Sequence, residues 1–273
     1  MIAEAQSTEQ IALSSELRLR GLMRSYTKVL VAYSGGVDSS YLALIATQEL
    51  GVNAICVLGI SASVSEAQRT EARVLAKEHD FNLQEIKTEE LLDPRYQANS
   101  NNRCYYCKTE LFSQLKDLGA KLGVERIVDG TNEDDLRGHR PGRIAAEEYG
   151  VHSPLAEVGL GKSAIRELSR IQGLRGWDKP ASPCLSSRIA YGVPVTIERL
   201  SQVEKAEGVL REFGFCEFRV RVHGDLARIE ISKQEMQRIL DESLLNTISD
   251  RVGSFGFKFV TLDLKGFRSG SFN

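Results

Sequence analysis

The sequence lacks both an excess of charge and a long apolar run. Its 273 residues carry 35 Lys and Arg against 37 Asp and Glu, which gives a formal net charge of −2. Such a balance offers no general positive field to attract nucleic acid or an anionic membrane, so neither is expected as a partner. No apolar stretch reaches the roughly 18 residues of a membrane helix, and the first residues are polar and acidic, unlike a secretory signal. These absences predict a folded protein of the cytoplasm.

Cysteine and proline are also scarce. The five cysteines are odd in number, and Cys104 and Cys107 stand in C-x-x-C spacing, which in a reducing compartment indicates metal or sulfur chemistry rather than structural disulfides. Three of the six prolines, Pro180, Pro183 and Pro194, lie in or just beyond the irregular stretch 173–192. Because proline interrupts regular structure, this stretch is the predicted domain boundary, with domains over residues 1–180 and 181–273.

Strand and helix patterns alternate before that boundary. Short apolar runs predict strands over 28–33 and 53–58, and the continuing alternation of strands with helices predicts strands over 82–87 and 126–129. Apolar residues at helical spacing predict helices over 7–26, 39–50, 65–79, 108–122 and 163–171. The alternation predicts an α/β fold with a parallel sheet covered on both faces, in which ligands bind beyond the carboxyl ends of the strands.

The segment after the boundary has a different order of elements. We expect helix, strand, strand, helix and strand over 197–213, 217–222, 227–232, 233–245 and 258–263, with a turn at 223–225. Two helices with three strands, two of them forming a hairpin, predict a smaller C-terminal α+β domain.

The segment that follows the first predicted strand has the composition of a phosphate-binding loop. It reads Ser-Gly-Gly-Val-Asp-Ser-Ser and opens a helix, so it directs bare backbone amides, short hydroxyls and a positive helix end toward one point. Glycine permits close approach of a ligand, and serine hydroxyls donate to phosphate oxygens. The spacing and lysine of a Walker loop are absent. The alternative is a plain turn between strand and helix. The nucleotide-binding residues predicted here are Ser34, Gly35, Gly36, Asp38, Ser39 and Ser40.

A second polar segment, Gly130 to Asp135, follows the strand predicted to end at Asp129. It therefore belongs to the same carboxyl edge of the sheet. Adjacent carboxylates at this edge, Asp134 among them, suit a Mg²⁺ ion on ATP, since that ion prefers hard oxygen ligands. The alternative is that Asn132 or Asp134 caps the following helix. Gly130 and Asp134 complete the predicted nucleotide site.

The loop Ser34 to Ser40 resembles the PP-loop signature of the ATP pyrophosphatase superfamily. That resemblance implies a sheet of the adenine nucleotide α-hydrolase type and cleavage of ATP between its α and β phosphates, which leaves AMP on the substrate. Further segments resemble one branch of the superfamily, the LarE family, the sulfur insertases of nickel-pincer nucleotide synthesis. These segments lie at 152–168, 177–192, 203–207, 219–223 and 227–230, so the resemblance covers nearly the whole chain.

The LarE resemblance implies a specific reaction and specific partners. Such an enzyme adenylates a carboxylate of pyridinium-3,5-dicarboxylate mononucleotide and converts it to a thiocarboxylate. The smaller domain is then expected to bind this substrate and to contribute to a homo-oligomer, a trimer or hexamer. Enzymes upstream and downstream in the cofactor pathway are the other implied partners.

The cysteines separate two mechanisms within that family. In its sacrificial form, the cysteine matching Cys184 gives up its sulfur and becomes dehydroalanine. This sequence adds Cys104 and Cys107, which with Cys184 are predicted to hold a [4Fe–4S] cluster with one iron open to an exogenous sulfide. Both routes stay open, and the cluster is the predicted one. Cys56 and Cys216 are expected to be small buried hydrophobes.

Two arginines of the smaller domain suggest a phosphate site. Arg219 and Arg221 alternate along a predicted strand, so their guanidinium groups leave the same face. Two such groups suit the phosphate of a mononucleotide, and Arg188 is a similar candidate. The alternative is a solvated strand face. Glu207 and Glu230 match acidic positions near the active site of the family.

Three other functions, two enzymatic and one without chemistry, remain for comparison. An amidotransferase would need a source of ammonia that no domain of this length supplies, and a tRNA thiolase would need a basic surface. A nucleotide sensor without chemistry would not need a reactive thiol at Cys184.

Overall fold

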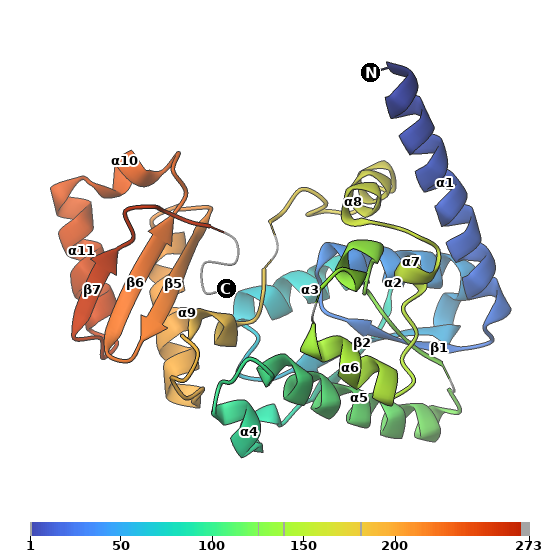
Figure 1. Cartoon of the computed structure of the whole chain (residues 1–273), viewed down its shortest axis with the longest axis horizontal. Helices are drawn as coiled ribbons and strands as arrows, with labels where there is room; N and C mark the ends of the chain where they lie inside the picture. The colour runs from blue at the N-terminus through green and yellow to red at the C-terminus, as the bar shows by residue number, and fades with distance from the viewer. Residues whose placement is uncertain (1, 125, 139, 181, 269–273) are drawn as a thin grey trace. The chain divides into compact units, whose positions relative to one another are not determined.

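The computed structural model describes residues 2–124, 126–138, 140–180 and 182–268, in which the chain divides into two compact units (Figure 1). Unit 1 comprises Met1–Ser61, Glu66–Glu90 and Cys104–Ser182. Unit 2 comprises Ala62–Ser65, Leu91–Arg103 and Pro183–Asn273. Ala181, the first residue of the predicted second domain, lies outside the described residues.

Unit 1 contains a four-stranded parallel sheet, which confirms the predicted α/β fold. Its strands are β1 (Val29–Tyr33), β2 (Ala54–Ile60), β3 (Asn82–Lys87) and β4 (Arg126–Asp129). The order across the sheet is β3-β2-β1-β4, so the direction of strand addition reverses between β1 and β4. Ligands of such sheets bind at this switch point, beyond the carboxyl ends of the two strands.

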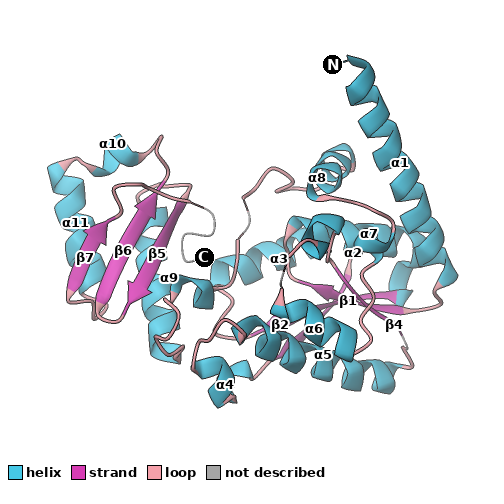
Figure 2. Cartoon of the chain, viewed as in Figure 1, coloured by secondary structure: helices cyan, strands magenta, loops and turns pink. Residues whose placement is uncertain are grey.

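Helices cover both faces of this sheet (Figure 2). One apolar core joins β1 and β2 to side chains from the first, second, third and eighth helices, and another joins them to the fifth and sixth. The helices are α1 (Ile2–Ser25), α2 (Val37–Leu50), α3 (Glu66–Glu78), α5 (Arg103–Leu122), α6 (Pro141–Glu148), α7 (Pro154–Glu157) and α8 (Lys162–Ile171). The helices α6 and α7 are not among the predicted ones, because each is short and begins at a proline.

Unit 2 is built on a three-stranded sheet. In it β5 (Phe218–His223) forms the predicted hairpin with β6 (Leu226–Ile231), and β7 (Phe259–Leu262) runs parallel to β6. The helix α9 (Ile197–Glu212) packs against β5. The segment Leu91–Arg103 adds the short helix α4 (Pro94–Gln97).

The predicted helix over 233–245 is wrong. The structure has a short helix, α10 (Met236–Ile239), and a separate one, α11 (Glu242–Gly253). The break occurs because the Asp241 side chain accepts a hydrogen bond from the backbone N–H of Leu244 at 3.0 Å and so caps a new helix.

In the described part of the chain, no helix combines the length and the apolar character that crossing a membrane requires.

Candidate functional site

The loop between β1 and α2 is closed by its own serines. The Ser39 hydroxyl accepts from the backbone N–H of Ser34 at 3.2 Å, donates to the Gly36 carbonyl at 3.0 Å and lies 3.0 Å from the Ser34 hydroxyl. Gly35 has φ +75°, and a Cβ there would lie 2.7 Å from the Cβ of Ala72. A side chain at Gly35 is therefore excluded by both conformation and space. The predicted residues form one compact loop, and the buried Ser40 follows in the first turn of α2.

Gly130 lets the end of β4 approach this loop. A Cβ on Gly130 would lie 2.7 Å from the backbone nitrogen of Ser39 and 2.9 Å from its Cα. The preceding residue, Asp129, is buried and accepts from the Ser153 hydroxyl at 2.8 Å and from the Thr131 hydroxyl at 2.8 Å. The segment after β4 is thus held against the first turn of α2, as the shared edge of the sheet predicts.

The carboxylates of the second polar segment form helix caps. Asn132 and Asp135 make reciprocal side-chain to backbone bonds of 3.2 Å around the short turn Glu133–Leu136. Asp134 accepts the backbone N–H of Lys162, the first residue of α8, at 2.7 Å. The capping alternative is therefore present in the structure. The Mg²⁺ role of Asp134 stays a prediction.

The first residue of α8 supplies a cation that the predicted site did not include. The Lys162 Nζ lies 2.5 Å from Asp38 Oδ2 in the first turn of α2. Asp38 Oδ1 is buried and has no hydrogen-bond partner among the described residues. Lys162 belongs to a segment of the LarE resemblance, which was the only sequence signal for it. Its position places one positive charge beside the Ser34–Ser40 loop.

The two cysteines of the C-x-x-C motif, Cys104 and Cys107, lie in unit 1, at the start of α5. Cys104 is exposed and Cys107 is partly buried, and their spacing of three residues places both on one helical face. Cys184 belongs to unit 2. Among the described residues, no three His, Cys, Asp or Glu form a group able to hold a metal ion.

The remaining two cysteines differ from each other. Cys56 is fully buried within β2, and burial raises the pKa of its thiol to about 12, which confirms the assignment as a small hydrophobe. The same assignment is wrong for Cys216, which is exposed. Cys216 precedes β5, and its backbone N–H donates to the Glu235 carboxylate at 3.1 Å, so the residue lies in a surface connection rather than inside the strand.

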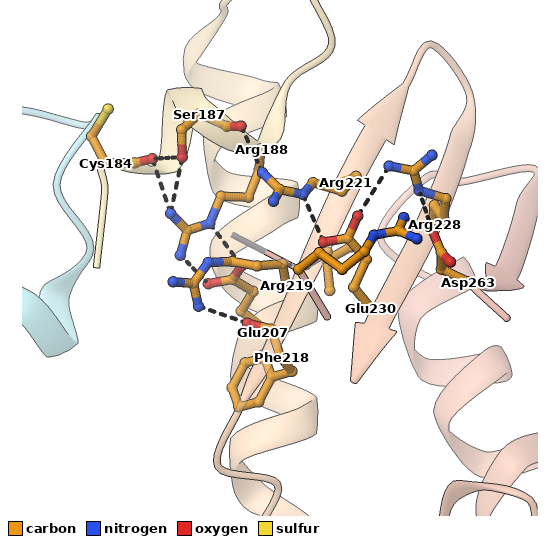
Figure 3. A network of polar contacts seen from close by, with 12 residues as sticks. Cys184, Ser187, Arg188, Glu207, Phe218, Arg219, Arg221, Arg228, Glu230 and Asp263 are labelled. Atoms are coloured by element: carbon orange, nitrogen blue, oxygen red, sulfur yellow. Dashed lines mark hydrogen bonds and ion pairs between the residues drawn. The ribbon is translucent and has the colours of Figure 1, made fainter. Parts of the chain in front are cut away.

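Cys184 precedes a tight turn, Leu185–Arg188, in unit 2 (Figure 3). Its carbonyl accepts from the Ser187 hydroxyl at 2.7 Å and from an Arg188 guanidinium nitrogen at 3.1 Å. Its sulfur points away from these contacts and is partly exposed. The bonds fix the backbone and leave the thiol at the surface of the turn.

Two buried ion pairs lie beside this turn. Arg188 donates to both carboxylate oxygens of Glu207, at 2.9 and 3.2 Å. Arg221 donates to Glu230 at 3.1 Å and to the Ser187 carbonyl at 3.0 Å, while Glu230 is fully buried. The predicted arginines and acids therefore meet in one network. The alternative of a solvated strand face is wrong.

Positive charge is in excess in this network (Figure 3). Burial, together with the neighbouring charge of Arg188, lowers the pKa of Arg219 to about 10. Arg228 and Asp263, 3.5 Å apart, add one charge of each sign to the three arginines and two glutamates. Arg268 also lies 3.2 Å from Asp263, so arginines outnumber acids here, and this partly buried excess of positive charge favours an anion as its ligand.

The Ser-Gly-Gly-x-Asp-Ser loop at the β1–β4 switch point of a four-stranded parallel sheet is consistent with the PP-loop fold class. The chain is 37% identical over 253 residues to the pyridinium-3,5-bisthiocarboxylic acid mononucleotide synthase of Lactiplantibacillus plantarum, covering 92% of this chain and 91% of that protein. It belongs to the LarE family, as does that synthase.

Two further relatives match over similar lengths. An uncharacterized protein of Synechocystis is 42% identical over 262 residues, which are 96% of this chain and 98% of the relative. One of Methanocaldococcus jannaschii is 32% identical over 242 residues, which are 89% and 91% of the two chains. No protein-family model matches the chain.

Proposed function

We propose that this chain is an ATP-dependent sulfur insertase that acts on pyridinium-3,5-dicarboxylate mononucleotide. It adenylates a carboxylate of this substrate and replaces the adenylate with sulfur, which yields a thiocarboxylate for nickel-pincer nucleotide synthesis. The observation that carries the proposal is the closed Ser34–Ser40 loop at the switch point, with Lys162 paired to Asp38 beside it. The name of the L. plantarum relative supports the choice of substrate.

Adenylation uses the residues of unit 1. A carboxylate oxygen of the substrate attacks the α phosphorus of ATP, the bond from that phosphorus to the α–β bridging oxygen breaks, and pyrophosphate leaves. The loop amides and the Ser34 and Ser39 hydroxyls bind the leaving phosphates, and Lys162 offsets their charge. The buried Asp38 Oδ1, which has no partner in the described structure, fits a hard cation. With Asp134 it would hold Mg²⁺, which neutralises phosphate charge.

The sulfur step is assigned to Cys184. A sulfur nucleophile attacks the acyl carbon, the C–S bond forms, the C–O bond to AMP breaks, and AMP leaves with the electron pair. On the sacrificial route the nucleophile is the Cys184 thiolate. A base then removes its Cα proton, the Cβ–Sγ bond breaks, the sulfur leaves with the thiocarboxylate, and residue 184 becomes dehydroalanine.

The cluster route would spare the cysteine. Thiols at Cys104, Cys107 and Cys184 have the donor chemistry of a [4Fe–4S] site, and two of them share one turn of α5. Such a cluster, when bound, would supply an exogenous sulfide in place of the sulfur of the protein. The fate of Cys184 therefore separates the routes.

The arginine network of unit 2 is proposed to bind the substrate phosphate. Arg188, Arg219 and Arg221 supply the positive surplus, and Glu207 and Glu230 hold two of the guanidinium groups in fixed directions. A homo-oligomer, trimer or hexamer, and enzymes before and after this one in the pathway belong to the same proposal. Sedimentation velocity measures the oligomeric state directly.

One reaction tests the proposal. The purified protein with ATP, Mg²⁺ and the dicarboxylate mononucleotide is expected to yield AMP, pyrophosphate and thiocarboxylate. Absence of AMP, or transfer of sulfur to tRNA instead, would overturn it. AMP binding without pyrophosphate release would identify a sensor.

The intact mass of the protein after one turnover decides between the routes. A loss of about 34 Da at Cys184 identifies the sacrificial route. An unchanged mass, with anaerobic brown absorbance that disappears in Cys104→Ala and Cys107→Ala, identifies the cluster.

A further inference from the structure

Two short segments from earlier in the chain belong to the unit that contains Cys184. Ala62–Ser65 follows β2 and Leu91–Arg103 follows β3, yet both form part of unit 2. Each makes buried hydrogen bonds to the turn after Cys184. From the first segment, the Ser63 carbonyl accepts the backbone N–H of Leu185 at 2.8 Å.

A chain of three buried hydroxyls links both segments to that turn. The Tyr96 hydroxyl lies 2.7 Å from the Ser63 hydroxyl and 2.6 Å from the Ser186 hydroxyl. All three side chains are buried, with exposed fractions of 2% for Ser63, 1% for Tyr96 and 0% for Ser186. Tyr96 is the middle member and contacts both serines.

The backbone of the turn has a second anchor in the same segment. The Arg103 guanidinium donates to the Ser186 carbonyl at 2.9 Å and to the Asn99 side chain. The Asn99 amide donates in turn to the carbonyls of Ala190 and Val193, at 2.9 and 2.8 Å. The turn that carries Cys184 is therefore bonded through its backbone by Arg103 and through a side chain by Tyr96.

We propose that Tyr96 is a positioning residue for Cys184, acting through the hydroxyl chain to Ser186. The inference rests on the sulfur-transfer role proposed for Cys184. Tyr96 does not touch the thiol. It fixes the turn from which the thiol projects, so that the sulfur meets the acyl adenylate in one geometry.

The physical basis is the hydrogen bonding among the three buried hydroxyls of Ser63, Tyr96 and Ser186. A hydroxyl can both donate and accept, and the Tyr96 hydroxyl lies within hydrogen-bonding distance of both serine hydroxyls. Removing the phenolic oxygen withdraws a partner from two buried hydroxyls at once, and buried networks respond more strongly than single exposed bonds. The Leu185–Arg188 turn then loses the side-chain bond that links Ser186 to the segment Leu91–Arg103.

The test compares Tyr96→Phe with Tyr41→Phe. Tyr41 is also fully buried, and its hydroxyl donates to Glu16 at 2.9 Å in unit 1, so both variants lose one buried tyrosine hydroxyl. The first readout needs no ATP: it is the rate at which iodoacetamide alkylates Cys184, followed by peptide mass spectrometry. We expect Tyr96→Phe to raise this rate about threefold to tenfold, the effect of losing one hydrogen bond on local opening, and Tyr41→Phe to leave it unchanged.

The second readout is the ratio of thiocarboxylate to pyrophosphate, because adenylation releases pyrophosphate whereas AMP leaves only when sulfur attacks the acyl carbon. A sulfur displaced by about 1 Å reacts about a hundredfold more slowly, whereas adenylation does not use the turn. Tyr96→Phe is therefore expected to release pyrophosphate at the wild-type rate and to form thiocarboxylate about tenfold to a hundredfold more slowly. Ser63→Ala, which removes only the far end of the chain, is expected to give a smaller change in the same direction.

The outcomes separate the two proposals. If Tyr96→Phe lowers the melting temperature as Tyr41→Phe does but leaves Cys184 alkylation and the product ratio at wild-type values, the residue is merely structural and the inference is overturned. If Tyr96→Phe does not fold, Ser63→Ala decides by the same two readouts. If the wild-type protein forms no AMP, the proposed function fails, and the alkylation rates still decide whether Tyr96 holds the turn.

Discussion

At the scale of single residues, Gly130 and Lys162 act on the Ser34–Ser40 loop from two other segments of the chain. Gly130 does so because it has no side chain, which lets β4 end against the first turn of α2. Lys162 does so because α8 begins at this residue, where Asp134 accepts its backbone N–H. The loop is thus shaped by residues about 90 and about 120 positions away, which local pattern does not reveal.

Gly130→Ala is expected to destabilise the protein and weaken ATP binding. The added methyl would lie 2.7 Å from the Ser39 nitrogen, which is backbone and cannot move aside without deforming the loop. Overpacking of this kind lowers the free energy of unfolding by about 1–3 kcal/mol, which urea unfolding measures. Calorimetry measures the ATP affinity. The matched control is Gly21→Ala in α1, where nothing lies within 4 Å of the new methyl. The free energy of unfolding of that variant should rise by about 0.5–1 kcal/mol. Equal ATP affinity in the two variants would contradict the prediction.

Lys162→Met is expected to reduce pyrophosphate release without unfolding the protein. The Lys162–Asp38 pair is partly exposed, with side-chain exposed fractions of 35% and 20%, so its loss changes stability by at most about 1 kcal/mol. Loss of one positive charge beside the leaving phosphates should slow their release about a hundredfold, measured by a coupled pyrophosphate assay. Lys258→Met, which breaks a similar pair with Asp225 in unit 2, should release pyrophosphate normally. Equal rates in the two variants would rule out the role of Lys162.

At the scale of elements, the strands were more predictable than the partners of their side chains. The strands β1, β2 and β4 are mostly buried and apolar, so sequence pattern located them, whereas β3 is only partly buried and was located by the alternation of strands with helices. The helix expected over 233–245 failed because one cap, Asp241, outweighed a continuous helical pattern. The ion pair of Arg188 with Glu207 spans 19 residues and two elements, so no local spacing announces it. Strand alternation predicted one face for Arg219 and Arg221 but not that this face would be buried.

Glu230→Gln tests the charge balance of the β5–β6 hairpin. Glu230 is fully buried and accepts from Arg221 at 3.1 Å and from Arg228 at 3.0 Å. Loss of its charge leaves two guanidinium groups without their common anion. The free energy of unfolding, measured in urea, should therefore fall by about 3 kcal/mol. The exposed pair of Glu212 with Arg251 provides the control, since Glu212→Gln should cost under about 1 kcal/mol. Similar costs for both variants would show that the buried carboxylate is not needed to balance the arginines.

At the scale of the whole molecule, the two units are interleaved along the sequence. Unit 2 takes most of its residues from 183–273 but also contains 62–65 and 91–103. A single boundary near proline-rich sequence does not describe such an arrangement. Hydrogen bonds between residues 90 or more positions apart leave no periodic signal in the sequence.

A fragment of residues 183–273 is expected to lack a fixed Cys184 turn. Without Leu91–Arg103 it loses the Asn99 amide bonds to Ala190 and Val193 and the Arg103 bond to the Ser186 carbonyl. Amide hydrogen exchange should show rapid exchange over residues 184–193 in the fragment and slow exchange in the full chain. Slow exchange in both would show that the earlier segments are dispensable for the turn. The β5–β6 hairpin within the fragment is the internal reference.

The Tyr96–Ser186 bond also orders events during synthesis. The two residues are 90 positions apart, so a ribosome that adds 5–20 residues per second makes the second roughly 5–20 s after the first. During this interval Tyr96 and Asn99 emerge without the carbonyls and hydroxyl that they later contact. The turn that follows Cys184 therefore cannot be completed before Ser186 has been translated, and by then Gly130, Lys162 and the whole Ser34–Ser40 loop have already been synthesised.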